Sequence, residues 1–96
     1  MLTKELLEQE LPLSEIADRR VVTPETIISH IEKLREKKQC PDVDYLKREL
    51  RRGEFDDIVE AFETVKTETL APIYNYLAKH KKKSTYLKIR LVRLFL

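Results

Sequence analysis

The sequence contains very little glycine and cysteine, with one residue of each among 96. A single glycine excludes the phosphate-binding loop G-x-x-x-x-G-K-[ST] of ATP-hydrolysing motors, which needs two. A β-hairpin usually needs glycine in its tight turn, so a chain with one glycine is poorly suited to form one. We therefore expect no β-hairpin wing beside a helical domain. The single Cys40 cannot form a disulfide within the chain, which fits a reducing compartment such as the cytoplasm.

Long apolar runs and metal-ligand spacings are also missing. No run approaches the 18 apolar residues of a membrane span, and the acidic N-terminal stretch lacks the apolar core of a signal peptide. One cysteine and two histidines, fifty residues apart, match no recognised zinc spacing. Asp56, Asp57 and Glu60 fit a helix N-terminus better than acid–base machinery. We therefore expect no membrane partner, and no metal, cofactor or catalytic residue in this chain.

The residues that are present favour a small all-α protein. Hydrophobic residues make up 42% of the chain and charged residues 38%, which suits a helix-rich globule. We expect about seven helices, in a tri-helical helix-turn-helix unit over 1–40 and a helical extension over 41–96 packed on it as one compact domain. Apolar spacing and capping residues predict helices near 4–10, 14–20, 24–38 and 43–51. Three further helices are predicted to start near residues 55, 69 and 84.

The stretch 13–34, LSEIADRRVVTPETIISHIEKL, predicts two helices joined by a tight turn. Ser14 and Thr23 are suitable N-caps, and Pro24 suits the first position of the second helix because its missing N–H costs nothing there. One face of that helix is apolar and predicts burial, as in a helix-turn-helix. Its residues are Ile27, Ile31 and Leu34.

The turn before this second helix departs from the common pattern. Many DNA-reading helix-turn-helices have glycine four residues after the small alanine of the first helix, because the turn needs a positive φ. Here Ala17 is followed by Val21 at that place, and valine is poorly suited to such a conformation. Either the turn is a different, longer one, or Arg20 is exposed and Val22 takes the buried position.

Charge is distributed unevenly along the chain. Residues 1–40 carry 7 basic and 8 acidic groups, a net of −1; residues 41–70 carry 5 and 9, a net of −4; and residues 71–96 carry 7 and none, a net of +7. Attraction to phosphate is therefore expected to be strongest near the C-terminal end.

Two groups of residues are candidates for DNA contact. The first group lies around the predicted turn and on the exposed face of the second helix. Glu25 on this face is unfavourable for contact with phosphate. The alternative is that this face is only solvated and binds nothing. His30 in this group could equally be a partly buried histidine bonded within the fold. The second is a basic run whose alternative is a mobile loop that offsets the acidic middle segment. The groups are Arg19, Arg20, Thr26, Ser29, His30 and Lys33, and Lys79, Lys81, Lys82, Lys83, Arg90 and Arg93.

The residues also resemble a known domain. LLEQELPLSEIADRRVVTPETIISHIEKL, with its Leu13-Ser14-Glu15-Ile16-Ala17 opening and its helix from Thr26 to Leu34, resembles the helix-turn-helix domain at the C-terminus of RecQ-like bacterial ATP-dependent DNA helicases. The tail FDDIVEAFETVKTETLAPIYNYL, followed by Tyr86, Ile89, Arg90, Leu91 and Val92, resembles the same domain.

This resemblance implies an accessory domain cut from a longer helicase, with Met1 as an internal or added methionine. Its partners would be duplex or forked DNA and the motor domains of the same polypeptide, which would bind ATP and Mg²⁺ and act in DNA repair. The location would be the bacterial cytoplasm, in association with the nucleoid.

Two other functions stay open at this stage. The last helix is apolar nearly all round, so residues 86–96 either are buried within the chain or form a homodimer or another protein contact. A free-standing transcription regulator that begins at Met1 is the other alternative.

Overall fold

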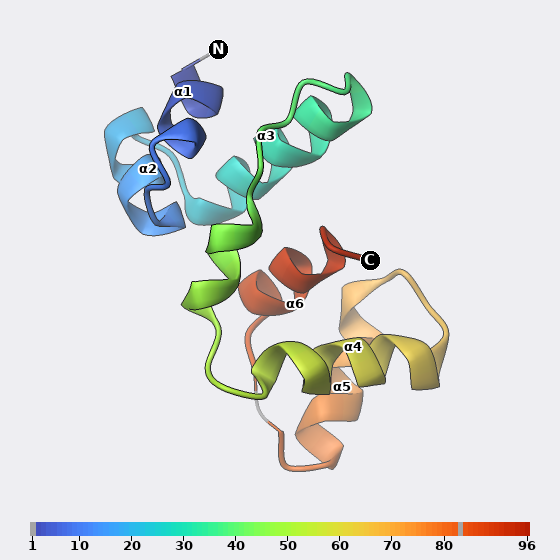
Figure 1. Cartoon of the computed structure of the whole chain (residues 1–96). Helices are drawn as coiled ribbons and strands as arrows, with labels where there is room; N and C mark the ends of the chain where they lie inside the picture. Colours follow the sequence, from blue (N-terminus) through green and yellow to red (C-terminus); the bar gives the residue numbers. More distant parts are fainter. Residues whose placement is uncertain (1, 83) are drawn as a thin grey trace. The chain divides into compact units, whose positions relative to one another are not determined.

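The computed structural model describes residues 2–82 and 84–96. Lys83, one of the predicted phosphate contacts, lies outside them. The described part of the chain contains seven helices and no strand, which confirms the expected all-α fold without a wing (Figure 1). The helices are α1 (Leu2–Glu8), α2 (Leu13–Arg20), α3 (Pro24–Glu36), the 3₁₀ helix η1 (Asp44–Glu49), α4 (Glu54–Val65), α5 (Leu70–Lys79) and α6 (Tyr86–Arg93).

The chain divides into two compact units, residues 1–49 and residues 50–96, hereafter unit 1 and unit 2. From the sequence, residues 41–49 were predicted to belong to the C-terminal extension, whereas in the structure they belong to unit 1. Long-range hydrogen bonds explain the difference. The Tyr45 hydroxyl donates to the Leu11 carbonyl at 2.5 Å, and the Glu49 carboxylate accepts from the Leu13 N–H at 3.1 Å. The packing of an extension over 41–96 on the helix-turn-helix stays a prediction.

The ends of the unit 1 helices follow local chemistry. Thr23 is extended and its Oγ1 accepts from the Thr26 N–H at 3.3 Å, with Pro24 next in the chain, as predicted. α2, by contrast, begins at Leu13 after the extended Pro12, so Ser14 lies inside the first turn and is not the N-cap. The N-cap prediction for α2 was wrong because proline already fixes the extended entry of the chain.

The buried apolar residues of unit 1 come from α1, α2, α3, η1 and Val43 just before η1. α3 turns its predicted apolar face inward and adds a fourth buried residue, Ile28. Each fully buried Leu or Ile side chain stabilises the fold by about 1.5–3 kcal/mol. The buried set is Leu6, Leu7, Leu13, Ile16, Ala17, Ile27, Ile28, Ile31, Leu34, Val43 and Leu46.

The turn between α2 and α3 is left-handed at Val21, with φ 56° and ψ 47°. The Val21 N–H donates to the Asp18 carbonyl at 3.2 Å and the Val22 N–H to the Ala17 carbonyl at 3.0 Å, which is the pattern of a Schellman motif. Val21 is 89% exposed, Val22 is also exposed, and Arg20 is half-buried. Valine thus takes the position usual for glycine, and the expected alternative with Val22 buried and Arg20 exposed was wrong.

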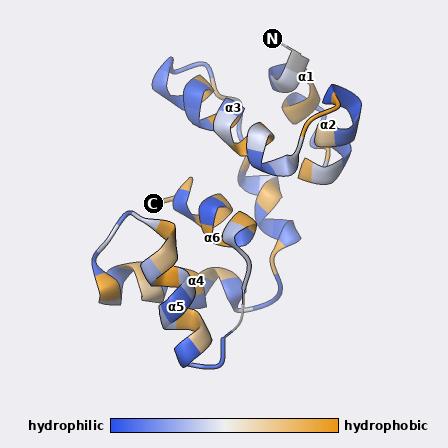
Figure 2. Cartoon of the chain, turned by 180° about the vertical axis from the view of Figure 1, so that it is seen from behind, coloured by the Kyte–Doolittle hydropathy of each residue, from blue (hydrophilic) through white to orange (hydrophobic). Residues whose placement is uncertain are grey.

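Unit 2 is built around a cluster shared by α4, α5 and α6, and Figure 2 shows hydrophobic residues on all three helices. Thr85 caps α6 by accepting from the Lys88 N–H at 3.2 Å, close to the helix start expected near residue 84. Most apolar residues of α6 are buried, which is one of the two outcomes expected for the last helix. The cluster consists of Ile58, Ala61, Phe62, Ile73, Leu77, Ile89 and Val92.

A buried carboxylate joins two distant segments of unit 2. Glu54, at the start of α4, is 7% exposed and accepts from the Arg51 N–H at 2.9 Å and from the Ser84 hydroxyl at 3.1 Å. Its carboxylate also lies 3.4 Å from Lys88 Nζ. Burial by itself raises the pKa of Glu54, but these hydrogen bonds and the Lys88 charge outweigh burial, so the pKa lies below its ordinary value.

Val21→Gly is expected to stabilise the protein, since a left-handed β-branched residue is strained and its exposed side chain loses little packing. Removing the strain should stabilise the fold by about 1–2 kcal/mol. Glycine loses more backbone entropy on folding than valine does, which offsets about 0.5–1 kcal/mol of this gain. We expect a net gain of roughly 0.5–1 kcal/mol and a thermal midpoint higher by about 4 °C, measured by circular dichroism. Val22→Gly, at a residue without positive φ, is the control and should destabilise. Equal destabilisation by both variants would contradict strain at Val21.

Candidate nucleic-acid interface

The outward face of α3 carries the predicted base-reading residues, and two of them are engaged locally. Thr26 Oγ1 lies 3.0 Å from Thr23 Oγ1 at the N-terminus of the helix. The Ser29 hydroxyl donates to the Glu25 carbonyl at 3.3 Å, four residues earlier. Such local bonds hold the hydroxyl groups along the helix. The Ser29 hydroxyl therefore presents mainly its acceptor lone pairs, whereas in the Thr23–Thr26 pair either hydroxyl can be the donor.

His30 is bonded within unit 1. Its Nδ1 lies 3.1 Å from Oγ1 of Thr3, which is fully buried and lies inside α1. Burial lowers the pKa of His30, and the positive charges of Arg20 and Lys33 lower it further. A neutral ring bonded to a buried hydroxyl favours the alternative in which His30 is a partly buried histidine bonded within the fold, and not a residue that contacts a DNA base.

The two arginines at the end of α2 differ in their surroundings. Arg19 is exposed and pairs with Glu15 one helical turn earlier, at 3.0 Å. Arg20 is half-buried, and its Nε is buried without a hydrogen-bond partner among the residues that the structure describes. Arg20 also acts electrostatically on His30, so the structure brings together Arg20, His30 and Lys33 from the predicted set. Phosphate binding by Arg19 and Arg20 stays a prediction.

A groove of about 500 Å³ in unit 1 contains Lys33 together with two lysines that the sequence analysis missed. It lies between α1 and the C-terminal part of α3, and no acidic residue lines it. Lys37 was detectable, because it follows Lys33 by four residues on the same helical face. Lys4 was not, because only the packing of α1 against α3 brings it there. The lining residues are Lys4, Lys33, Leu34, Lys37 and Gln39.

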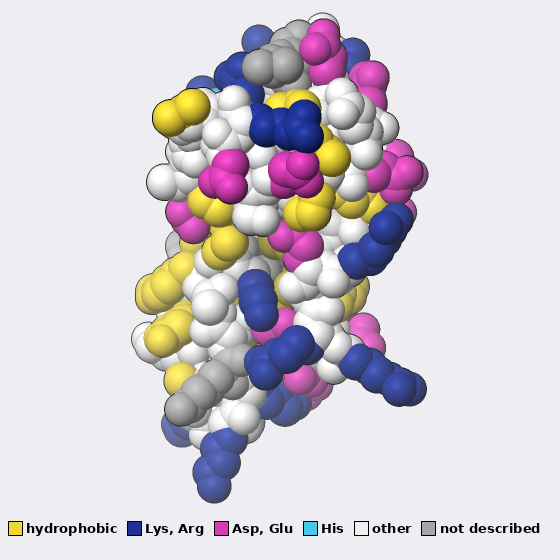
Figure 3. Space-filling view, turned by 90° about the vertical axis from the view of Figure 1, so that its left-hand side faces the viewer, with side chains coloured by type: hydrophobic (Ala, Val, Ile, Leu, Met, Phe, Trp, Pro, Cys, Tyr) yellow, Lys and Arg dark blue, Asp and Glu magenta, His cyan; other side chains and the backbone are white. Residues whose placement is uncertain are grey.

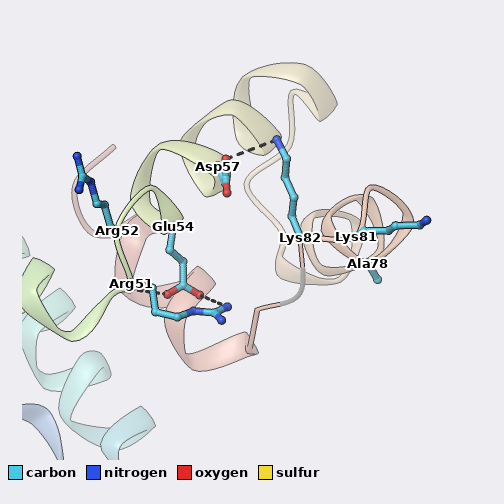
Figure 4. Close-up of a pocket in the computed structure, with 7 residues that line it drawn as sticks. All are labelled: Arg51, Arg52, Glu54, Asp57, Ala78, Lys81 and Lys82. Atoms are coloured by element: carbon cyan, nitrogen blue, oxygen red, sulfur yellow. Dashed lines mark hydrogen bonds and ion pairs between the residues drawn. The ribbon is translucent and has the colours of Figure 1, made fainter.

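The basic run of unit 2 borders a cleft of about 680 Å³ (Figure 4), where part of its charge is offset. Lys82 Nζ lies 3.5 Å from Asp57 and 4.0 Å from Glu60. Figure 4 shows Lys82 reaching toward Asp57, whereas Lys81, which also lines the cleft, extends away from Asp57. Lys82 therefore fits the alternative in which the basic run offsets nearby acidic residues. Lys79 at the end of α5 and Lys81 just after it are exposed.

Two further cations near the C-terminal end, Arg93 and Lys88, contact groups of unit 2. Arg93 donates to the Glu68 carbonyl at 3.0 Å, and Lys88 contacts Glu54. Arg90 is half-buried on α6. On the face shown in Figure 3, basic and acidic side chains are interspersed. The net charge of +7 over 71–96 thus overstates the charge available to phosphate.

The structure adds two findings on other kinds of site. Among the residues described, no group of three or more His, Cys, Asp or Glu side chains is placed to hold a metal ion. None of the described helices is long and apolar enough to cross a membrane.

Protonation of His30 should make unit 1 less stable in mild acid. The folded-state pKa lies below the ordinary 6.5, so the unfolded chain binds the proton more readily. The stability that neutral His30 contributes is complete above pH 6.5 and is lost as pH falls through 6.5 toward the folded-state pKa. Thermal unfolding between pH 7.5 and 5.5 should therefore show a falling midpoint that His30→Gln flattens. His80→Gln, at an exposed site, should keep the wild-type slope; a slope unchanged in His30→Gln would contradict the assignment.

Comparisons with known proteins place this geometry in a family. Searches of curated proteins and of solved structures found no match. A family model described as a helix-turn-helix domain matches residues 1–93, nearly the whole chain. Domains of this kind typically bind DNA, with the second helix of the motif in the major groove. The family model, together with the helix–turn–helix of α2 and α3, shows that the chain belongs to the helix-turn-helix domain family.

Proposed function

We propose that this chain is a DNA-binding accessory domain of a RecQ-like ATP-dependent DNA helicase. It contacts DNA mostly through phosphates and helps to position it for the motor. The observation that carries DNA binding is the family match over 1–93, supported by the left-handed turn that joins α2 to α3. The assignment to a RecQ-like helicase rests on the sequence resemblance of residues 55–77 and 86–92.

The chemistry of α3 favours phosphate contact over base reading. The hydroxyls of Thr26 and Ser29 are held in local bonds, and His30 is bonded to Thr3. Exposed Glu25 near the N-terminus of α3 is unfavourable beside a phosphate. Contacts to phosphate fix position but carry no sequence information. We therefore propose weak binding without sequence preference.

Catalysis belongs to the motor in this proposal. The motor domains of the same polypeptide would bind ATP and Mg²⁺ and hydrolyse the nucleotide, and this chain would contribute no catalytic residue. A reading frame that continues upstream of Met1 into helicase motifs would support this part of the proposal. A frame that begins at Met1 would favour the free-standing regulator.

Fluorescence anisotropy of labelled duplex and forked DNA tests the DNA-binding part directly. At low salt the chain should bind both forms, and affinity should fall steeply as salt rises, because each neutralised phosphate releases counterions. Equal affinity for unrelated sequences is expected. Tight binding to one palindrome would favour a regulator, and no binding to either form would contradict the proposal.

A negative charge on the outward face of α3 should weaken this binding. Ser29→Glu places a carboxylate beside the proposed phosphates, and we expect about a tenfold loss of affinity at low salt. Asn75→Glu makes the same charge change at an exposed position of α5 in unit 2 and should leave the affinity nearly unchanged. Equal losses in both variants would show that net charge, and not the α3 face, governs binding.

A further inference from the structure

The groove of unit 1 is lined by three lysines. Lys4 comes from α1, Lys33 comes from α3, and Lys37 is the C-cap residue that follows α3, four residues after Lys33. No ion pair involving these three lysines occurs within 2–82 and 84–96. Elsewhere in the chain Lys82 and Lys88 contact acidic residues. The groove therefore keeps its full positive charge.

From this arrangement we infer that Lys4, Lys33 and Lys37 form the phosphate-binding site of the domain, and that it holds the backbone of a nucleic acid strand. This inference rests on the proposed function and specifies where the DNA backbone is bound. It differs from the expectation that the basic run near residue 80 is the main phosphate contact.

The spacing of the lysines fits a strand better than a small anion. The groove has a volume of about 500 Å³, and its charged atoms stand at the ends of long, flexible side chains. Lys33 and Lys37 are separated by about 6 Å of helix rise, while one strand of duplex DNA carries a phosphate about every 3.4 Å along its axis. Lys33 on α3 and Lys37 at its C-cap can therefore reach separate phosphates of the same strand.

The groove also continues the outward face of α3. Ser29, Lys33 and Lys37 follow one another at intervals of four residues, so they lie along one side of the helix. A duplex placed against Ser29 would meet the lysines at the C-terminal part of the same helix. The neighbouring His30 lies within the field of this surface: burial lowers its pKa, and the charges of Arg20 and Lys33 lower it further.

The decisive experiment compares two charge-matched double variants of the full chain. Lys33→Gln with Lys37→Gln removes two cations from the groove, and Lys79→Gln with Lys81→Gln removes two exposed cations from unit 2. All four side chains are exposed, so both proteins should fold, which circular dichroism checks. Binding of a labelled duplex is then measured by anisotropy from low to moderate salt.

The groove variant should lose about tenfold in affinity at low salt. Its plot of log affinity against log salt should become shallower by about 2, since each duplex phosphate contributes about 0.9 to the slope. The unit 2 variant should keep the wild-type affinity and slope. Amide shifts of the isotope-labelled wild type on adding duplex should centre on Lys4, Lys33 and Lys37, and inorganic phosphate at equal phosphate concentration should not reproduce them.

Other outcomes overturn the inference and separate it from the proposed function. If the wild type binds DNA but only the unit 2 variant is impaired, DNA binding stands and the groove is not its site. If neither variant is impaired, the groove is again excluded while DNA binding remains. If inorganic phosphate reproduces the shifts, the groove is a small-anion site. If the wild type binds no DNA, the proposed function fails together with the inference.

Discussion

The burial of one face of α3 is the constraint on which the functional surface depends. Ile27, Ile28 and Ile31 are fully buried, and their spacing fixes the rotation of the helix about its axis. Because that rotation is fixed, Ser29 and Lys33 must face outward. A polar substitution at a buried position would therefore damage DNA contact indirectly, by turning or loosening the helix that carries it.

Much of the fold follows from local sequence chemistry. The repeat of apolar residues, Thr23 as a cap and Pro24 after it predict α3 well, because these signals act within a few residues. Val21 shows where local reasoning stops. Valine disfavours a positive φ, yet two hydrogen bonds to carbonyls of α2 and the packing of α2 on α3 hold it there. Tertiary structure overrides the preference of one exposed residue at a modest cost.

The candidate site was harder to predict than the fold, since a charge counts only when no partner offsets it. The linear sum of charge pointed to residues 71–96, but Lys82 and Arg93 there are engaged with groups of their own unit. Residues 1–40 carry a net charge of −1, yet three of their four lysines line a groove with no acidic residue among its described lining. Lys4 joins Lys33 only through the packing of two helices, which periodicity along one helix cannot reveal.

The buried Glu54 carboxylate has a consequence for how unit 2 folds. Its hydrogen bond to Ser84 spans 30 residues, so the start of α4 cannot be completed until the segment before α6 has arrived. A chain shortened before Ser84 would leave a desolvated carboxylate without Ser84 and Lys88, and such an unpaired charge strongly destabilises its surroundings. The start of α4 and the start of α6 thus stabilise each other through Glu54.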